Sequence, residues 1–203
     1  MNIVCLDLEG VLVPEIWIEF AERTGIDALR ATTRDVPDYD VLMLQRLRIL
    51  REYRLGLPDI QAVIAKMQPM QGAREFLDWV RSEFQLLILS DTFYEFAMPL
   101  MRQLGYPTLI CHRLSTDASG FVNHYHLRQK DPKRKAVQAL HSLNYKVIAA
   151  GDSYNDMGML SEADVGFFFC PPDNIIAEFP QFKVTRDYDA LKHAIGGAQQ
   201  GFS

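Results

Sequence analysis

Short apolar runs bounded by turn residues recur along this chain, and several are separated by segments with helical spacing of apolar residues. The runs cover residues 3–6, 86–89, 108–111, 146–150 and 165–169, and the helical segments include 73–84, 93–104 and 135–143. Runs that are apolar throughout are typical of strands buried on both faces of a sheet. Alternation of such strands with helices builds a parallel sheet from βαβ units. The sequence therefore predicts an α/β doubly wound (Rossmann-like) parallel sheet core.

Residues 14–69 break this pattern. Segments such as "WIEFAERTGI" and "YDVLMLQRLRILREY" have helical periodicity and are punctuated by glycine and proline. We expect a helical cap domain at 14–69, inserted after the first strand, and a core domain made of residues 1–13 and 70–203. A Ser-Gly turn between β-prone flanks predicts a hairpin within residues 114–127. The C-terminal "GGAQQGFS" has little to bury and is predicted to be disordered.

Bulk properties exclude several classes of function. The chain has 203 residues, of which 48% are hydrophobic, enough for one substantial core with a smaller inserted domain. Its net charge of −5 argues against nucleic-acid binding, which needs a basic surface. We find no signal peptide, and no run approaches the roughly 20 apolar residues of a membrane span. Cys5, Cys111 and Cys170 are widely separated in apolar runs, which predicts buried thiols in a reducing, cytoplasmic compartment.

The first apolar run ends on two acids, Asp7 and Glu9, in "IVCLDLEGVL". If strand geometry continued, both carboxylates would point to one side, because side chains alternate across a strand. Two unit charges about 4 Å apart repel by roughly 4 kcal/mol at an effective dielectric constant of 20. A cation bound beside the acids would remove this repulsion.

Other apolar runs also end on polar residues. These are Ser90 and Asp91 in "LLILSDT", and Asp152, Asn155 and Asp156 in "VIAAGDSYND". Lys133, in "KDPKRK", opens the helix before the last of these strands. In an open parallel sheet, ligands bind outside the carboxyl ends of the strands. We therefore expect these side chains to converge there.

The residue types suit a phosphorylated ligand and a divalent cation. Asp7, Asp152 and Asp156 offer hard oxygen ligands for Mg²⁺, whose coordination is usually completed by water and substrate phosphate. Lys133 would neutralise phosphate oxygens, with two other lysines of the same basic run as alternatives. Ser90 could donate its hydroxyl group, and main-chain N–H groups at the start of the following helix favour an anion.

In these motifs the chain resembles the haloacid dehalogenase-like phosphatases. The ordered motifs are Asp7-Leu8-Glu9, Ser90-Asp91, Lys133 and Gly151-Asp152-Ser153-Tyr154-Asn155-Asp156, and together they span most of the chain. Asp-Leu-Glu-Gly, with "LRQKDPKRK" and "AAGDSYND", is most similar to the bifunctional phosphoserine phosphatase/phosphoserine:homoserine phosphotransferase branch. The position of the helical insertion also resembles the small helical cap of phosphoserine phosphatases.

The resemblance implies a role for each acid. Asp7 would be the nucleophile that forms an aspartyl-phosphate intermediate. Glu9 would protonate the leaving oxygen and then activate the acceptor, which needs a pKa nearer neutrality than that of a free glutamate. Mg²⁺ would be held by Asp7, the main-chain carbonyl of Glu9, and Asp152, with Asp156 as a further ligand or a support. Glu9 stands where the family usually has an aspartate, so its acid/base geometry differs by one methylene group.

The resemblance further implies L-phosphoserine as the substrate and homoserine as an additional acceptor. Glu15 would meet the substrate ammonium group, and Arg46 would bind its carboxylate, with Arg48 as the alternative. Ser90, Asp91, Lys133 and Asn155 would surround the phosphorylated part of the ligand. Two other hypotheses remain: a phosphatase for another small phosphomonoester, and a non-catalytic protein that binds a phosphorylated metabolite.

Overall fold

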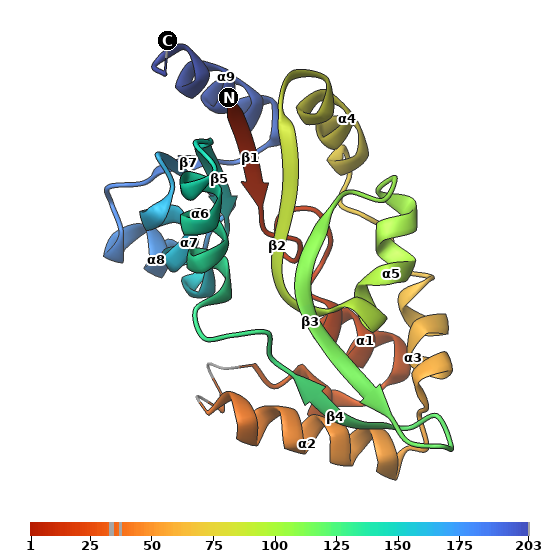
Figure 1. Cartoon of the computed structure of the whole chain (residues 1–203). Helices are drawn as coiled ribbons and strands as arrows, with labels where there is room; N and C mark the ends of the chain where they lie inside the picture. The colour runs from red at the N-terminus through yellow and green to blue at the C-terminus, as the bar shows by residue number, and fades with distance from the viewer. Residues whose placement is uncertain (33–34, 37, 203) are drawn as a thin grey trace.

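The computed structural model describes residues 1–32, 35–36 and 38–202, and its centre is a seven-stranded sheet (Figure 1). The strand order is β4-β3-β2-β1-β5-β6-β7, and every neighbouring pair is parallel except β3 and β4. The strands are β1 (Asn2–Leu6), β2 (Gln85–Phe93), β3 (Leu109–Thr116), β4 (Val122–His126), β5 (Lys146–Gly151), β6 (Val165–Phe169) and β7 (Lys183–Thr185). The predicted doubly wound core is therefore confirmed. The edge strand β7 was not predicted, because its three residues form no recognisable apolar run.

The predicted hairpin is formed by β3 and β4. Arg113 pairs with His126, and Leu114 pairs with Tyr125. The turn contains Gly120, whose φ of +83° lies in the left-handed region that favours glycine. The hairpin extends beyond the carboxyl ends of the neighbouring strands (Figure 1).

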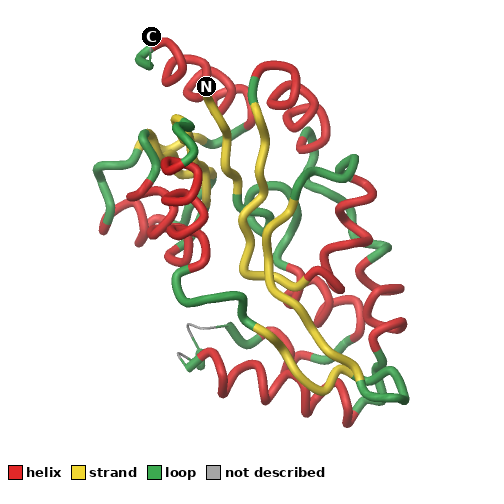
Figure 2. The backbone as a smooth tube through the Cα atoms, viewed as in Figure 1, coloured by secondary structure: helices red, strands yellow, loops and turns green. Residues whose placement is uncertain are grey.

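Each face of the sheet has its own core, because side chains alternate along a strand. Val4 and Leu6 of β1 pack into one cluster, whereas Ile3 and Cys5 pack into the other. The first face is covered by α4 (Ala73–Glu83), α5 (Tyr94–Gln103) and α9 (Tyr188–Gln200), and the second by α6 (Pro132–Ser142), α7 (Met157–Glu162) and α8 (Asp173–Glu178) (Figure 2). Burial of both faces explains why the strand sequences are apolar throughout.

The segment 14–69 contains helices and no strand within its described residues. The helices are α1 (Ile16–Thr24), the 3₁₀ helix η1 (Asp27–Arg30), α2 (Tyr39–Glu52) and α3 (Leu57–Ile64). They lie beyond the carboxyl ends of β1 and β2 (Figure 1). Helix α2 runs along β4, where the hydroxyl group of Tyr125 donates to the Asp40 carboxylate. None of the described helices combines the length and apolar character that crossing a membrane would require.

The prediction of a disordered C-terminal tail is wrong for residues 196–202. Helix α9 continues to Gln200, because Leu191, Ala194 and Ile195 are buried against the core and Phe202 packs beside them. Packing of this apolar face stabilises the helix despite its glycines. Ser203 lies outside the described residues.

Candidate active site

The sheet topology brings the predicted residues to one place. The strand order reverses at β1, which lies between β2 and β5. At such a switch point the connections leave in opposite directions, and a crevice forms at the carboxyl ends of the strands. Asp7 directly follows β1 and Asp152 directly follows β5, so both residues stand at the edge of this crevice.

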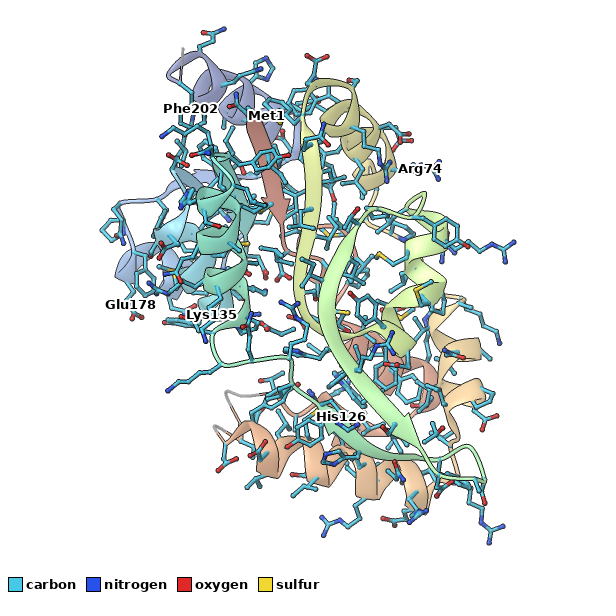
Figure 3. The ribbon with its side chains drawn as sticks, in the orientation of Figure 1. Met1, Arg74, His126, Lys135, Glu178 and Phe202 are labelled. Atoms are coloured by element: carbon cyan, nitrogen blue, oxygen red, sulfur yellow. The ribbon has the colours of Figure 1, made fainter. Side chains whose placement is uncertain are left out.

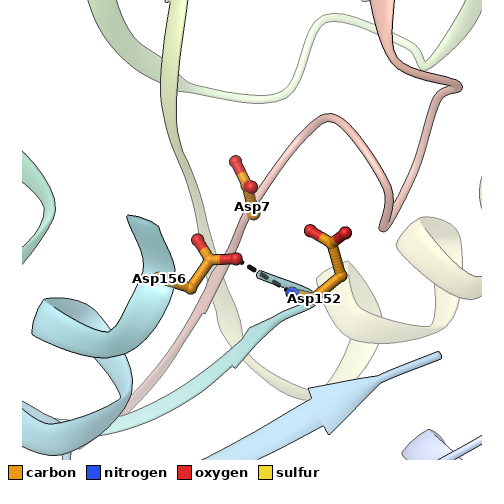
Figure 4. A group of neighbouring side chains, drawn as sticks. All are labelled: Asp7, Asp152 and Asp156. Carbon is orange, nitrogen blue, oxygen red and sulfur yellow. Dashed lines mark hydrogen bonds between the residues drawn. The ribbon is translucent and has the colours of Figure 1, made fainter. Parts of the chain in front are cut away.

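Asp7, Asp152 and Asp156 face one another (Figure 4). One carboxylate oxygen from each lies within 4.8 Å of the others. Asp7 and Asp156 are buried, whereas Asp152 is half-buried. The main-chain N–H of Asp7 donates to the carbonyl of Ala150 at 3.0 Å, which ties the backbone of Asp7 to β5.

Glycines leave room for these carboxylates. Gly10 has a φ of +74°, and a Cβ atom there would lie 2.4 Å from the Asp152 carboxyl group. A Cβ atom at Gly151 would lie 2.3 Å from Cγ of Asp156. Both distances are far shorter than a van der Waals contact, so a larger residue at either position would displace an acid.

Lys133 is the buried lysine of the basic run. Its Nζ lies 2.7 Å from Oδ1 of Asp156 and 3.0 Å from Oδ1 of Asp7. Lys130 and Lys135 are exposed, and Lys135 is seen on α6 in Figure 3. Of the three candidate lysines, Lys133 is therefore the one that lies buried beside the acids.

Both oxygens of Asp156 are engaged by the protein. Asp156 lies in the 3₁₀ helix η2 (Tyr154–Asp156), and its Oδ1 accepts from Lys133. Its Oδ2 accepts from the main-chain N–H groups of Asp152 and Ser153 at 2.9 and 3.1 Å. These contacts favour Asp156 as a support that fixes the loop after β5.

The charges at this site call for a further cation. Burial, followed by the charge of Asp156, raises the pKa of Asp7 well above its usual range. Burial also raises the pKa of Asp152 to about 7, and Asp156 and Glu15 add to this shift. Lys133 opposes both shifts but brings a single positive charge to this group of acids. A surplus of buried carboxylate oxygens fits a hard divalent cation.

Glu9 does not share a side of the strand with Asp7, because β1 ends before both residues. Its Oε2 accepts from the main-chain N–H of Ile16 at 2.8 Å, and its carboxyl group also interacts with Thr92 and Glu15. Burial, and then the charge of Glu15, raises the pKa of Glu9 to about 8. A carboxyl group that titrates near neutrality can both donate and accept a proton.

Arg46 is buried on α2 and interacts electrostatically with Glu9 and Glu15. Its guanidinium group lies 4.4 Å from the centre of the Trp17 ring, and its Nη2 donates to a main-chain carbonyl at 2.8 Å. Its buried Nε has no hydrogen-bond partner among the described residues. Such a group in a native protein calls for an acceptor, which a ligand can supply. Arg48, the alternative, is exposed.

Ser90 and Asp91 lie where β2 bulges relative to β3. The buried Ser90 hydroxyl oxygen accepts from the main-chain N–H of Thr92 at 3.2 Å. Oδ2 of Asp91 accepts from Nδ2 of Asn155 at 2.9 Å and lies 3.5 Å from Nζ of Lys133. Asp91 thus links Asn155 to Lys133.

The predicted residues fall into two adjoining groups, one around Lys133 and one around Glu9. Further residues interact with these groups and were not predicted: Thr92 interacts with Glu9, Tyr39 interacts with Arg46, and His112 lies 3.7 Å from Asp91. His112 follows an apolar run, as the predicted acids do, and this feature could have identified it. Thr92 and Tyr39 carry no comparable pattern.

Comparison with known proteins identifies the family and relatives of this chain. A family model described as haloacid dehalogenase-like hydrolase matches residues 1–164. The chain is 67% identical over 192 residues to a phosphoserine phosphatase of Pseudomonas syringae pv. tomato, covering 95% of this chain and 81% of that protein. It is also 67% identical over 192 residues to phosphoserine phosphatase ThrH of Pseudomonas aeruginosa, covering 95% of this chain and 94% of that protein.

Solved structures share the fold. A phosphoserine phosphatase in its apo form superimposes with a TM-score of 0.75 at 18% identity, covering 94% of this chain and 98% of that chain. A phospho-aspartyl intermediate analogue of phosphoserine phosphatase gives 0.76 at 17% identity, covering 95% and 98%. At these identities the likeness concerns the fold.

Proposed function

The chain belongs to the haloacid dehalogenase-like hydrolase family, and on this premise we propose that it is a Mg²⁺-dependent phosphoserine phosphatase. The single observation that carries the substrate is the 67% identity to the Pseudomonas phosphoserine phosphatases over most of the chain. The buried contacts of Lys133 with Asp7 and Asp156 support the chemistry, because they put a cation beside the proposed nucleophile.

We further propose that residues 14–69 act as a cap that recognises the amino acid part of the substrate. Arg46 would bind the carboxylate of L-phosphoserine, which would supply an acceptor for the unpartnered Nε. Glu15 is exposed and lies next to Glu9, and it would bind the substrate ammonium group. Enclosure under the cap would exclude water from the reacting groups.

In the first proposed step, a carboxylate oxygen of Asp7 attacks the phosphorus atom and the bond to the serine oxygen breaks. Lys133 neutralises charge on the phosphoryl oxygens, and Ser90 and Asn155 orient them. Protonated Glu9 gives its proton to the departing serine oxygen. The products of this step are L-serine and an aspartyl-phosphate at Asp7.

In the second proposed step, Glu9 acts as a base. Its carboxylate takes a proton from water, the water oxygen attacks phosphorus, and the bond to Asp7 breaks to release phosphate. The hydroxyl group of homoserine can take the place of water, which would give homoserine phosphate. The likeness to phosphoserine phosphatase ThrH supports this second acceptor as a further proposal.

Asp7, the main-chain carbonyl of Glu9, and Asp152 would hold Mg²⁺, with Asp156 supporting the loop. When bound, Mg²⁺ supplies positive charge that reduces repulsion between the nucleophile and the phosphate. The acidic cluster fits this ion through its hard oxygen donors. We also propose a cytoplasmic location, which the free thiols of Cys5, Cys111 and Cys170 support. Cys5 and Cys111 are buried as predicted, whereas Cys170 is exposed and its predicted burial is wrong.

Phosphate release tests the proposal. Purified protein is incubated with L-phosphoserine, with and without Mg²⁺ and homoserine, and Asp7→Asn serves as the control. We expect phosphate release that requires both Mg²⁺ and Asp7, and homoserine phosphate at its expense when homoserine is present. Cleavage of an aryl phosphate without cleavage of phosphoserine would favour another small phosphomonoester. Tight ligand binding without turnover of any phosphomonoester would favour a binding protein.

A further inference from the structure

His112 is a buried histidine next to the proposed phosphoryl site and has no role in the steps above. Its side chain lies on β3 and the residue is only 4% exposed. Its Nε2 lies 3.7 Å from Oδ1 of Asp91. On the other side of the ring, Nδ1 accepts from the main-chain N–H of Arg128 at 3.2 Å. The ring therefore connects Asp91 to the segment that leads into α6 and Lys133.

The contact with Arg128 determines which ring nitrogen carries the proton. A main-chain N–H can only donate, so Nδ1 must be the unprotonated acceptor and the neutral ring carries its proton on Nε2. The protonated nitrogen of His112 therefore faces the Asp91 carboxylate. The crevice beside the ring, lined in part by Ser90 and Lys133, has no space for a water molecule. Both ring nitrogens of His112 thus face groups of the protein, Asp91 on one side and the main-chain N–H of Arg128 on the other.

Asp91 connects His112 to residues that would touch the phosphoryl group. Its Oδ2 accepts from Nδ2 of Asn155 at 2.9 Å and lies 3.5 Å from Nζ of Lys133. The amide oxygen of Asn155, Oδ1, accepts from the Ser153 hydroxyl group. The orientation of the Asn155 side chain is therefore set by a hydrogen bond at each end of its amide. One carboxylate therefore joins β2, β3, η2 and the start of α6.

A carboxylate at this position also presents an electrostatic problem. A negative charge beside a phosphate site repels the substrate unless fixed partners neutralise it. Although burial favours protonation, Lys133, His112 and Asn155 together hold the pKa of Asp91 well below its usual range. The carboxylate thus remains charged and depends on its neighbours to keep it in place.

We propose that His112 is a positioning residue for phosphoryl transfer: its Nε2–H is directed at the Asp91 carboxylate 3.7 Å away and helps to hold it in place, and Asp91 in turn orients Asn155 and contacts Lys133. The inference rests on the proposed phosphatase chemistry but not on the identity of the substrate. Groups that orient a catalytic residue in this way commonly contribute about 10- to 100-fold to activity.

A double-mutant cycle on the full chain with Mg²⁺ tests the proposal. His112→Ala, Asp91→Asn and the double variant are assayed for kcat and KM with L-phosphoserine and with p-nitrophenyl phosphate. We expect His112→Ala to lower kcat/KM about 10- to 100-fold for both substrates, since both present the same phosphoryl group. In the Asp91→Asn background, His112→Ala should lower kcat/KM by less than about threefold. An equal loss in both backgrounds would overturn the proposal.

His112→Gln is the conservative variant, because its amide N–H can reach toward Asp91 as the ring N–H does. We expect it to recover activity to within about fivefold of the wild type, whereas a purely structural role would leave it as impaired as His112→Ala. Activity on p-nitrophenyl phosphate without activity on L-phosphoserine would reject the substrate assignment. The double-mutant cycle of His112 and Asp91 could then still be measured with p-nitrophenyl phosphate.

A spectroscopic measurement covers the case in which the variants fail to fold or neither substrate is cleaved. Ring ¹⁵N resonances of the wild-type protein report the tautomer of each histidine, and sequence-specific assignment of the wild-type protein by through-bond correlations identifies the ring of His112. We expect a neutral ring protonated at Nε2. A ring protonated at Nδ1 would contradict the contact with Asp91 and overturn the proposal.

Discussion

The ammonium group of Lys133 lies 3.0 Å from the Asp7 carboxylate, and the two side chains are 3% and 4% exposed. Charges removed from water to this extent persist only when they are paired. Asp156 completes the arrangement at 2.7 Å from the same ammonium group. The lysine that would neutralise the phosphate therefore also stabilises the folded chain.

Replacement of Lys133 by methionine should impair both stability and activity. It leaves Asp7 and Asp156 buried without their cation, which costs about 3–5 kcal/mol in the free energy of unfolding. Urea denaturation measures this loss, and phosphate release should fall below detection. Lys135→Met, on the exposed side of the same helix, is the matched control and should change stability by less than about 0.5 kcal/mol. Equal effects of the two substitutions would contradict the assignment of Lys133.

Replacement of Gly151 by alanine should disturb the site by steric overlap. The new Cβ would lie 2.3 Å from Cγ of Asp156, so we expect a loss of about 1–3 kcal/mol in unfolding free energy and at least a tenfold loss of kcat/KM. Gly196→Ala is the matched control, because a Cβ in that helix meets nothing within 4 Å. It should stabilise the protein by about 0.5–1 kcal/mol. A melting temperature that falls for Gly151→Ala and rises for Gly196→Ala would support the close approach of Gly151 to Asp156.

Replacement of Arg46 by glutamine should discriminate between substrates. Loss of a charge-assisted contact of about 1.5–3 kcal/mol would lower kcat/KM for L-phosphoserine roughly 10- to 100-fold. An aryl phosphate lacks the amino acid carboxylate and should be affected much less. Arg48→Gln, on the exposed side of α2, should leave both substrates unchanged. A larger loss in the Arg48 variant would reverse the assignment.

The stability of the metal-free protein should depend on pH in a defined direction. The pKa values of Asp7, Asp152 and Glu9 are all raised in the folded state, to about 7 for Asp152 and about 8 for Glu9. Between the unfolded value near 4 and these folded values, the folded state binds more protons than the unfolded state. Stability must therefore fall as pH rises through this window. The melting temperature without metal should be higher at pH 5 than at pH 8.

Mg²⁺ should oppose this loss, since a bound cation favours the ionised carboxylates. The increase in melting temperature on adding Mg²⁺ should be larger at pH 8 than at pH 5. The pKa of Asp91 is lowered, so between pH 5 and pH 8 this residue is ionised in both the folded and the unfolded state and adds almost no slope. Asp152→Asn should reduce both the pH dependence and the response to Mg²⁺. An unchanged response in this variant would contradict a cation site at Asp152.

Local patterns predicted much of the molecule. Apolar runs identified the main strands, because a strand covered on both faces must be apolar throughout. The predicted acids lie at the carboxyl ends of β1 and β5, where the order of strands in the sheet reverses. The C-terminal tail was predicted wrongly, since nothing in "GGAQQGFS" indicates that its helix packs on the core.

Spacing and residue type were enough to predict the parallel core, the helical nature of residues 14–69 and the chemical groups at the strand ends. The packing of the elements settled that Lys133 and Arg46 are buried whereas Lys130, Lys135 and Arg48 are exposed. It also placed Glu9 beside Glu15 and His112 beside Asp91. The physical reason is that long side chains can extend in several directions from one backbone position. Their final partners come from segments that are distant in sequence and meet only when the sheet and its helices pack together.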